Sequence, residues 1–252
     1  MLGASNITFS LPTVVRAVQR TFDGHARLWA VHGHGRSYGK RSRAVGRELD
    51  GILESGFWQA FGDRAVEGPV YALVTDLGND LIYDVPPAQI IDWADECLQR
   101  LSAADSDGHV ECTVTKMPAE ALLSLSAPRF YTTQKLFFPK QRADWELMKS
   151  QIRELDGLID NLAERHAATL VPTRRHWYFI DPIHLRELRR REAWRLYLGG
   201  WPTAPEPDVP LVGPRDRYRI HRLQPAVKWV GPEERRHPQP VLTEDRFEFR
   251  QW

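Results

Sequence analysis

Apolar runs alternate with helix-period segments between residues 1 and 198, which is the pattern of parallel strands joined by crossover helices. Short apolar runs predict buried strands over residues 28–31, 70–75, 110–115 and 177–180. Apolar side chains spaced three and four residues apart predict helices over residues 11–22, 86–101, 144–166 and 184–197. We therefore expect a three-layer α/β/α fold, in which helices cover both faces of a central parallel sheet of about five strands.

The first strand of this sheet has little sequence to form it, because only Met1 and Leu2 precede Gly3. Either that strand is very short or it begins upstream of this sequence, where a leader segment could also have been lost. Arg16 and Arg20 interrupt any apolar stretch that could act as a signal peptide. No run of about 18 apolar residues is present to span a membrane. We expect a cytoplasmic protein with no membrane partner.

The composition changes after Gly199. Five prolines fall between Pro202 and Pro214, and a basic stretch covers residues 215–222. Such a segment is typical of a loosely ordered extension that wraps a domain or adds a hairpin. We therefore divide the chain into a domain of residues 1–198 and a C-terminal extension of residues 199–252.

Charge and cysteine content exclude two classes of protein. The net charge of +1, from 34 Lys and Arg against 33 Asp and Glu, gives no general basic field for binding nucleic acid. Cys97 and Cys112 are too few for a secreted disulfide framework. We expect two packed thiols, with a single bridge between them left open as the alternative.

Polar groups suited to chemistry follow the predicted strands. Ser5 follows the first strand, a Gly-rich loop over residues 32–39 follows the second, Asn79 follows the third, and Asp181 and His184 follow the last. In the strand order 2-1-3-4-5, the first and third strands are neighbours at the point where ligands bind to open parallel sheets. We expect these groups to face one crevice.

The residue types fit nucleophilic catalysis. A serine nucleophile needs an imidazole to take its proton, a carboxylate to orient that imidazole, and donors for the oxyanion. Ser5, His184 and Asp181 are the candidates for the first three roles. The candidate oxyanion donors are the Ser5 backbone N–H, the Asn79 amide, and the N–H of Gly35, with Gly33 as its alternative.

These motifs and their order resemble the SGNH (GDSL-type) hydrolase family over residues 1–198. Gly3-Ala4-Ser5 is similar to the family's Gly-Asp-Ser turn, Gly78-Asn79-Asp80 to its Gly-x-Asn-Asp block, and Asp181 with His184 to its Asp-x-x-His block. Ala4 and Leu77 depart from the usual Asp and Gly. The resemblance implies a serine esterase that needs no cofactor and cleaves a small-molecule ester with a small acyl or acetyl group.

Two other functions remain open at this stage. A catalytically silent SGNH-like fold could serve as a binding or scaffold module, and Ala4 and the short first strand favour it. A metal site is the other, since His32 and His34 stand two residues apart at a strand end. Further metal ligands could come from Asp76, Asp80, Asp181 and His184.

The Gly-rich loop itself does not indicate a nucleotide site. It lacks the Lys-Ser/Thr ending of a P-loop and the spacing of a dinucleotide fingerprint. Arg36 and Tyr38 of this loop are candidates for lining the substrate cleft.

Overall fold

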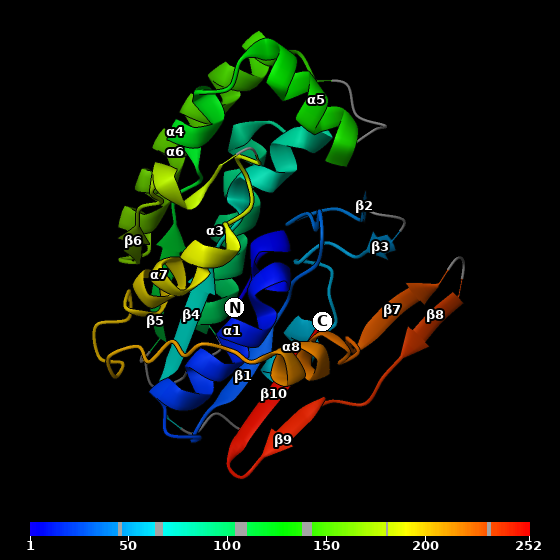
Figure 1. The fold of residues 1–252 in the computed structure, drawn as a ribbon, viewed down its shortest axis with the longest axis vertical. Helices are drawn as coiled ribbons and strands as arrows, with labels where there is room; N and C mark the ends of the chain where they lie inside the picture. Colours follow the sequence, from blue (N-terminus) through cyan, green and yellow to red (C-terminus); the bar gives the residue numbers. More distant parts are fainter. Residues whose placement is uncertain (45–46, 64–67, 104–109, 138–142, 180, 231–232) are drawn as a thin grey trace.

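The computed structural model describes residues 1–44, 47–63, 68–103, 110–137, 143–179, 181–230 and 233–252 of a mixed α/β protein (Figure 1). Its parallel sheet has the strand order β4-β5-β6, formed by β4 (Val70–Val74), β5 (Val110–Thr115) and β6 (Thr169–Val171). Val74 pairs with Val114, and Thr115 pairs with Val171. The carboxyl ends of the three strands therefore lie along one edge, as the alternation of strands and helices predicts.

A second sheet joins the beginning and the end of the chain. β1 (Arg27–Ala30) pairs in parallel with β10 (Phe247–Gln251), which pairs antiparallel with β9 (Leu242–Glu244). The other strands form two antiparallel pairs: β2 (Ser42–Ala44) with β3 (Arg47–Leu49), and β7 (Val227–Val230) with β8 (Glu233–Arg236).

The predicted central sheet of about five parallel strands is not present as such. The residues before Gly3 form a single bridging position, Leu2, in place of a strand. Leu2 bridges in parallel to Val31 beyond β1 and to Val74 of β4. Its N–H donates to Leu73 O at 2.8 Å, and its carbonyl accepts from Thr75 N at 2.9 Å. Two residues are too few for a strand, so the two sheets meet through one residue.

Helices pack on both sides of these strands. On one side, Leu73 belongs to a buried cluster with α1 (Ser5–Thr21) and α7 (Glu187–Leu198). On the other side, Ala72 and Val74 belong to a cluster with α3 (Pro87–Ala103) and α6 (Trp145–Arg165). Successive side chains of a strand point to opposite faces, which explains this alternation. The remaining helices are α2 (Phe57–Gly62), the 3-10 helix η1 (Leu77–Tyr83), α4 (Ala119–Leu123), α5 (Ala127–Phe137), the 3-10 helix η2 (Arg175–Trp177) and α8 (Pro214–His221).

Helix α1 begins six residues earlier than its apolar pattern predicts, at Ser5 instead of Leu11. Its first turn is held by a distant carboxylate, because Asp76 accepts hydrogen bonds from the N–H groups of Ala4 at 2.9 Å and Asn6 at 3.1 Å. This cap comes from the end of β4, so no local sequence signal marks the start of the helix.

The strand predicted over residues 177–180 is wrong. Trp177 ends η2, Tyr178 is buried, Phe179 is 68% exposed, and Ile180 lies outside the described residues. The strand that pairs with β5 is β6, directly after α6. Trp177 is instead buried by an edge-on contact with Tyr197 of α7, at 5.8 Å between ring centroids. The apolar run therefore corresponds to two buried aromatic side chains and an exposed one, and it does not mark a strand.

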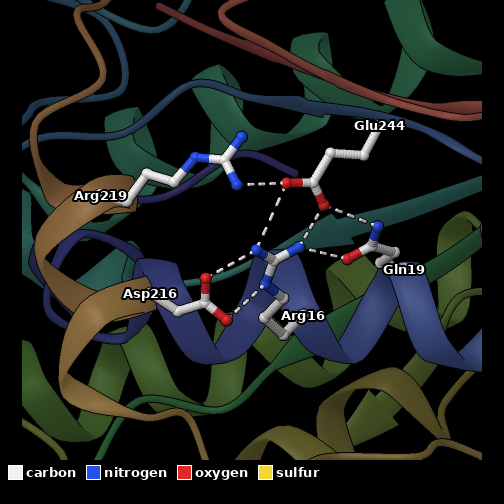
Figure 2. A network of polar contacts seen from close by, with 5 residues as sticks. All are labelled: Arg16, Gln19, Asp216, Arg219 and Glu244. Carbon is white, nitrogen blue, oxygen red and sulfur yellow. Dashed lines mark hydrogen bonds and ion pairs between the residues drawn. The ribbon is translucent and has the colours of Figure 1, made fainter.

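The C-terminal residues are built into the fold more firmly than their composition predicts. The side chains of Phe247 and Phe249 in β10 are fully buried. Figure 2 shows a polar network that ties the same region to α1: Arg16 binds Asp216 of α8 at 2.8 Å and Glu244 of β9 at 2.5 Å. Residues 199–252 thus share a sheet with β1 and ion pairs with α1.

Two smaller expectations can be compared with the described residues. Cys97 and Cys112 are free and buried, which confirms the two packed thiols. Across the described ranges, no helix has both the length and the apolar character needed to cross a membrane.

Candidate active site

Ser5 and His184 form a direct hydrogen bond, although 179 residues separate them in the chain. Ser5 is the first residue of α1 and lies three residues after the Leu2 bridge, at the carboxyl edge of the strands. His184 lies just before α7. The distance from Ser5 Oγ to His184 Nε2 is 2.8 Å, which is within reach of direct proton transfer.

Asp181 holds the other side of the same imidazole. Its Oδ2 lies 2.5 Å from His184 Nδ1, while its Oδ1 accepts the N–H groups of Ile183 at 3.0 Å and His184 at 3.2 Å. Burial alone would raise the pKa of the Asp181 carboxyl, but the hydrogen bond and charge interaction with His184 and the two backbone donors lower it. The carboxylate form is thereby favoured, and it fixes the orientation of the ring.

Asn6 connects the serine to the histidine segment. Its side-chain Nδ2 donates to Ile183 O at 3.0 Å, and its Oδ1 accepts the N–H of Leu185 at 2.9 Å. These are the two residues on either side of His184. Asn6 also donates to Asp76 Oδ1 at 2.8 Å. One side chain next to Ser5 therefore holds the backbone on both sides of His184.

Asp76 accepts the hydrogen bonds that hold Ala4 and Asn6 beside the end of β4. It follows β4 in a left-handed backbone conformation, with φ +64°. Burial raises the pKa of its carboxyl, and the hydrogen bonds from Asn6 and Ala4 oppose that rise. Sequence reasoning considered Asp76 only as a metal ligand and missed Asn6. The adjacency of Asn6 to the proposed nucleophile was the only local signal, since both roles depend on contacts distant in the sequence.

Two candidate oxyanion donors, the Ser5 N–H and the Asn79 amide, belong to residues that line one cavity. Ser5, Asn79 and Asp76 line a cavity of about 110 Å³. Within the described part of the chain, no group accepts a hydrogen bond from the Ser5 N–H, which lies at the positive end of a helix of 17 residues. Asn79 Nδ2 donates one of its two hydrogens to Arg36 O at 2.8 Å, so the other is left for a ligand.

The Gly-rich loop is tied to this edge through that Asn79 bond. Gly35 is buried with φ +65°, a conformation that suits glycine, and no described residue accepts its N–H. Gly33 lies against the Leu49 side chain. Neither glycine is among the described residues that line the cavity, so the structure does not bring them to it as it brings Ser5 and Asn79.

The two histidines of the loop have structural contacts. His32 Nδ1 lies 2.9 Å from Thr8 Oγ1, and its Nε2 lies 3.0 Å from Gln251 Oε1. Burial lowers the pKa of His32 to about 4, so the ring is neutral. His34 packs on Phe9, which itself meets the His184 ring edge-on at 4.9 Å between centroids. Among the described residues, no three His, Cys, Asp or Glu side chains are grouped to hold a metal ion.

Arg36 and Tyr38 do not line the cleft as expected. Both are almost fully buried. The Arg36 guanidinium donates to the carbonyl of Trp252 at 2.7 Å, and Tyr38 Oη donates to Thr75 O at 2.6 Å. They hold the loop to the C-terminus and to β4. Asp80 is also buried and accepts the Tyr38 N–H at 2.9 Å.

The chain was compared with family models, with curated proteins and with solved structures, and none of the three comparisons found a match.

Proposed function

We propose that this protein is a serine hydrolase that cleaves an ester bond. The single observation that carries the proposal is the hydrogen-bonded chain from Ser5 Oγ through His184 to Asp181, with distances of 2.8 Å and 2.5 Å. This chain combines a nucleophile, a base and an orienting carboxylate in hydrogen-bond reach of one another. A scaffold would have no need for such an arrangement beside a cavity.

In the first half of the reaction, Ser5 Oγ attacks the acyl carbonyl and its proton passes to His184 Nε2. His184 then gives that proton to the alkoxide as the C–O bond breaks, which leaves an acyl-enzyme and a free alcohol. In the second half, His184 takes a proton from water, the hydroxide attacks the acyl-enzyme, and the proton returns to Ser5 Oγ as the acid departs. Asp181 stabilises the imidazolium in both halves.

The negative oxygen formed in each half requires donors on the opposite side of the carbonyl. We assign the Ser5 N–H and the second hydrogen of the Asn79 amide to this role, and we do not assign Gly35 to it because Gly35 does not line the cavity. Loss of one such donor costs about 100- to 1000-fold in turnover. The support is that Ser5 and Asn79 line the same cavity, that the Ser5 N–H has no acceptor in the described part of the protein, and that Asn79 Nδ2 uses only one hydrogen, on Arg36 O.

The resemblance to SGNH hydrolases is part of this proposal. Leu2 would take the place of the family's first strand, giving the order β1, Leu2, β4, β5, β6, which corresponds to 2-1-3-4-5. The support comes from the parallel bridges of Leu2 to both neighbours. Ala4 stands where the family usually has Asp. A carboxylate is nevertheless present beside this turn, because Asp76, which follows β4, accepts the Ala4 N–H.

Hydrolysis of p-nitrophenyl acetate tests the proposal. We expect turnover by the wild type, a loss of about 10⁴-fold or more in Asp181→Asn, and a loss at least as large in Ser5→Ala and His184→Ala. Ser10→Ala on the same helix and His176→Ala on the surface are matched controls and should keep full activity. Hydrolysis that survives Ser5→Ala would overturn the proposal. A folded wild type without turnover would point to the binding or scaffold module.

A further inference from the structure

The cavity beside Ser5 extends away from the triad between apolar walls. Leu81 and Ile82 of η1 form part of one wall, and Leu122 of α4 and Phe130 of α5 form another. Met148 and Ile152 of α6 also line the cavity. In Figure 1, α5 and the adjoining part of α6 lie beyond the carboxyl ends of β4 and β5. Phe130 stacks on Trp145 at 4.5 Å between ring centroids and holds α5 against α6.

Several polar side chains that line this cavity away from Ser5 are already paired within the protein. Thr115 Oγ1 donates to Thr75 Oγ1 at 2.8 Å, and Thr173 Oγ1 donates to Met117 O at 2.9 Å. Lys116 Nζ binds Asp160 at 2.8 Å. Gln134 has an amide nitrogen without a partner, but that atom has no surface open to the cavity. The surface that remains for a ligand is therefore mainly apolar, and the Thr133 hydroxyl is a polar group on it.

The volume limits what can fill this space. An apolar cavity of about 150 Å³ holds one benzene molecule. A cavity of about 110 Å³ is somewhat smaller, so it has room for a chain of about four to six carbons when the carbonyl carbon stands at Ser5. An acetyl group would leave most of the apolar surface uncovered.

We infer that this cavity binds the acyl part of the substrate, and that the preferred substrate is an ester of an unbranched, apolar acid of about four to six carbons. This inference rests on the proposed ester hydrolysis and makes its acyl group specific. Each methylene that the cavity removes from water should raise kcat/KM about fourfold, up to the length at which the cavity is full.

Two series of esters test whether the acyl part or the alcohol part of the substrate enters the cavity. The first keeps p-nitrophenol and varies the acid from acetate to decanoate. The second keeps acetate and varies the alcohol from ethanol to hexanol. In the first series we expect kcat/KM to rise about tenfold or more from acetate to the optimum near butyrate or hexanoate, and to fall for octanoate and decanoate. In the second series we expect no such optimum.

Substitution of two leucines, one in the cavity and one outside it, tests whether the preference for acyl length comes from the cavity. Leu122 lines it, whereas Leu158 on α6 packs elsewhere, and both are partly buried. Leu122→Phe should lower kcat/KM for hexanoate about tenfold and leave acetate within about threefold. Leu158→Phe should change neither. Ile152→Ala, which enlarges the cavity, should move the optimum to a longer acid and serves as the second variant.

The outcomes separate this inference from the proposed function. If Ser5-dependent hydrolysis is found but acetate is the best acid and Leu122→Phe changes nothing, the acyl pocket is wrong and the hydrolase stands. An optimum in the alcohol series that Leu122→Phe removes would show that the cavity binds the alcohol, and a preference for acids with polar tails would overturn the apolar assignment. Absence of any Ser5-dependent hydrolysis would overturn both.

Discussion

Asn6 shows how a single side chain assembles a site from distant parts of the chain. It bonds Asp76 after β4 and both residues that flank His184. The Ser5–His184 distance therefore depends on a side chain that touches neither reacting atom. Asn6 is a positioning residue in this account.

Replacement of Asn6 tests that role. Asn6→Ala should lower the rate of Ser5-dependent hydrolysis about 10- to 100-fold, because the His184 backbone loses both of its Asn6 hydrogen bonds and the imidazole is no longer aligned. The measurement is kcat/KM together with thermal unfolding. Asn161→Ala, an exposed asparagine on α6, is the control and should keep both values. A fully active, folded Asn6→Ala protein would show that Asn6 does not position the histidine.

Asp80 gives the protein a pH-dependent stability. Burial raises the pKa of its carboxyl to about 6, above the usual value of 3.8. The folded state thus holds the proton more tightly than the unfolded state. The resulting contribution is fully present below about pH 4 and is lost as the pH rises through 6, by about 1 to 3 kcal/mol.

Urea unfolding of Asp80→Asn between pH 4 and pH 7 measures this contribution. The amide keeps an acceptor for the Tyr38 N–H and stays neutral, so the variant should lose the fall in unfolding free energy that the wild type shows over this range. Asp92→Asn removes an exposed carboxylate of α3 and should follow the wild type. Parallel curves for wild type and Asp80→Asn would contradict the assignment.

At the scale of elements, the site depends on the close approach of the Gly3 backbone to Thr75, the residue after β4. A Cβ at Gly3 would lie 2.6 Å from Thr75 Cγ2 and 2.8 Å from Ile7 Cδ1, both on buried side chains. The Leu2 bridge and the start of α1 are set by this contact. A larger residue would move Ser5 relative to Asp76.

Gly3→Ala should therefore lower the unfolding free energy by about 1 to 3 kcal/mol and reduce hydrolysis. Gly157→Ala is the matched substitution, since a Cβ there meets no atom within 4 Å and the residue lies inside α6. That change should stabilise the protein by up to about 1 kcal/mol. Chemical unfolding of the two variants provides the comparison. Equal effects of both substitutions would contradict the close approach at Gly3.

Local patterns predicted the helices better than the sheet. The periodicity over residues 86–101 and 144–166 agrees with α3 and α6 within two residues at each end, because an amphipathic stripe is a property of the segment alone. The strand predicted from the aromatic run at 177–179 is wrong because Trp177 is buried against α7 from a 3-10 helix and Phe179 is exposed, and a short run of apolar residues does not distinguish this arrangement from a strand. Pairing partners such as β10 for β1 lie too far away in sequence for a period to reveal.

The sequence indicated the residues of the proposed triad and Asn79, but it did not indicate the residues that position them. Ser5 and Asn79 follow Leu2 and β4, whose carboxyl ends meet at one edge, so their residue types and order were informative. The strand predicted before Asp181 and His184 is not present in the described residues, and Asn6 holds that segment at the edge instead. Asn6 and Asp76 act through contacts 70 and 177 residues apart. Those contacts exist only in the folded chain, so no spacing in the sequence indicates them.

At the scale of the whole molecule, the C-terminal residues are held to α1 by charge as well as by β10. Arg16 is 15% exposed and binds Asp216 and Glu244, while Arg219 reaches the second oxygen of Glu244 (Figure 2). The hydrogen bond from Arg16 lowers the pKa of Glu244 to about 2. Stability from this carboxylate is present above the unfolded value near 4.5 and is lost as the pH falls toward 2.

Arg16→Met should lower the unfolding free energy at pH 7 by about 2 kcal/mol, because two carboxylates lose a partly buried partner. Arg20→Met is the matched control on the same helix. Its ion pair with Asp208 has side chains 58% and 50% exposed, so the loss should stay within about 0.5 kcal/mol. The difference between the two variants should shrink below pH 4. Equal stabilities at pH 7 would show that the network does not hold the C-terminal residues.

Fluorophosphonate labelling followed by intact-mass analysis and peptide mapping tests the central claim most directly, because the reagent reacts with an activated serine whatever the natural ester is. We expect one adduct per chain, located on Ser5, absent from Ser5→Ala, much slowed in His184→Ala and unchanged in Ser10→Ala. A folded wild type that takes no label, or an adduct on another residue, would contradict the assignment of Ser5, His184 and Asp181 as a catalytic triad.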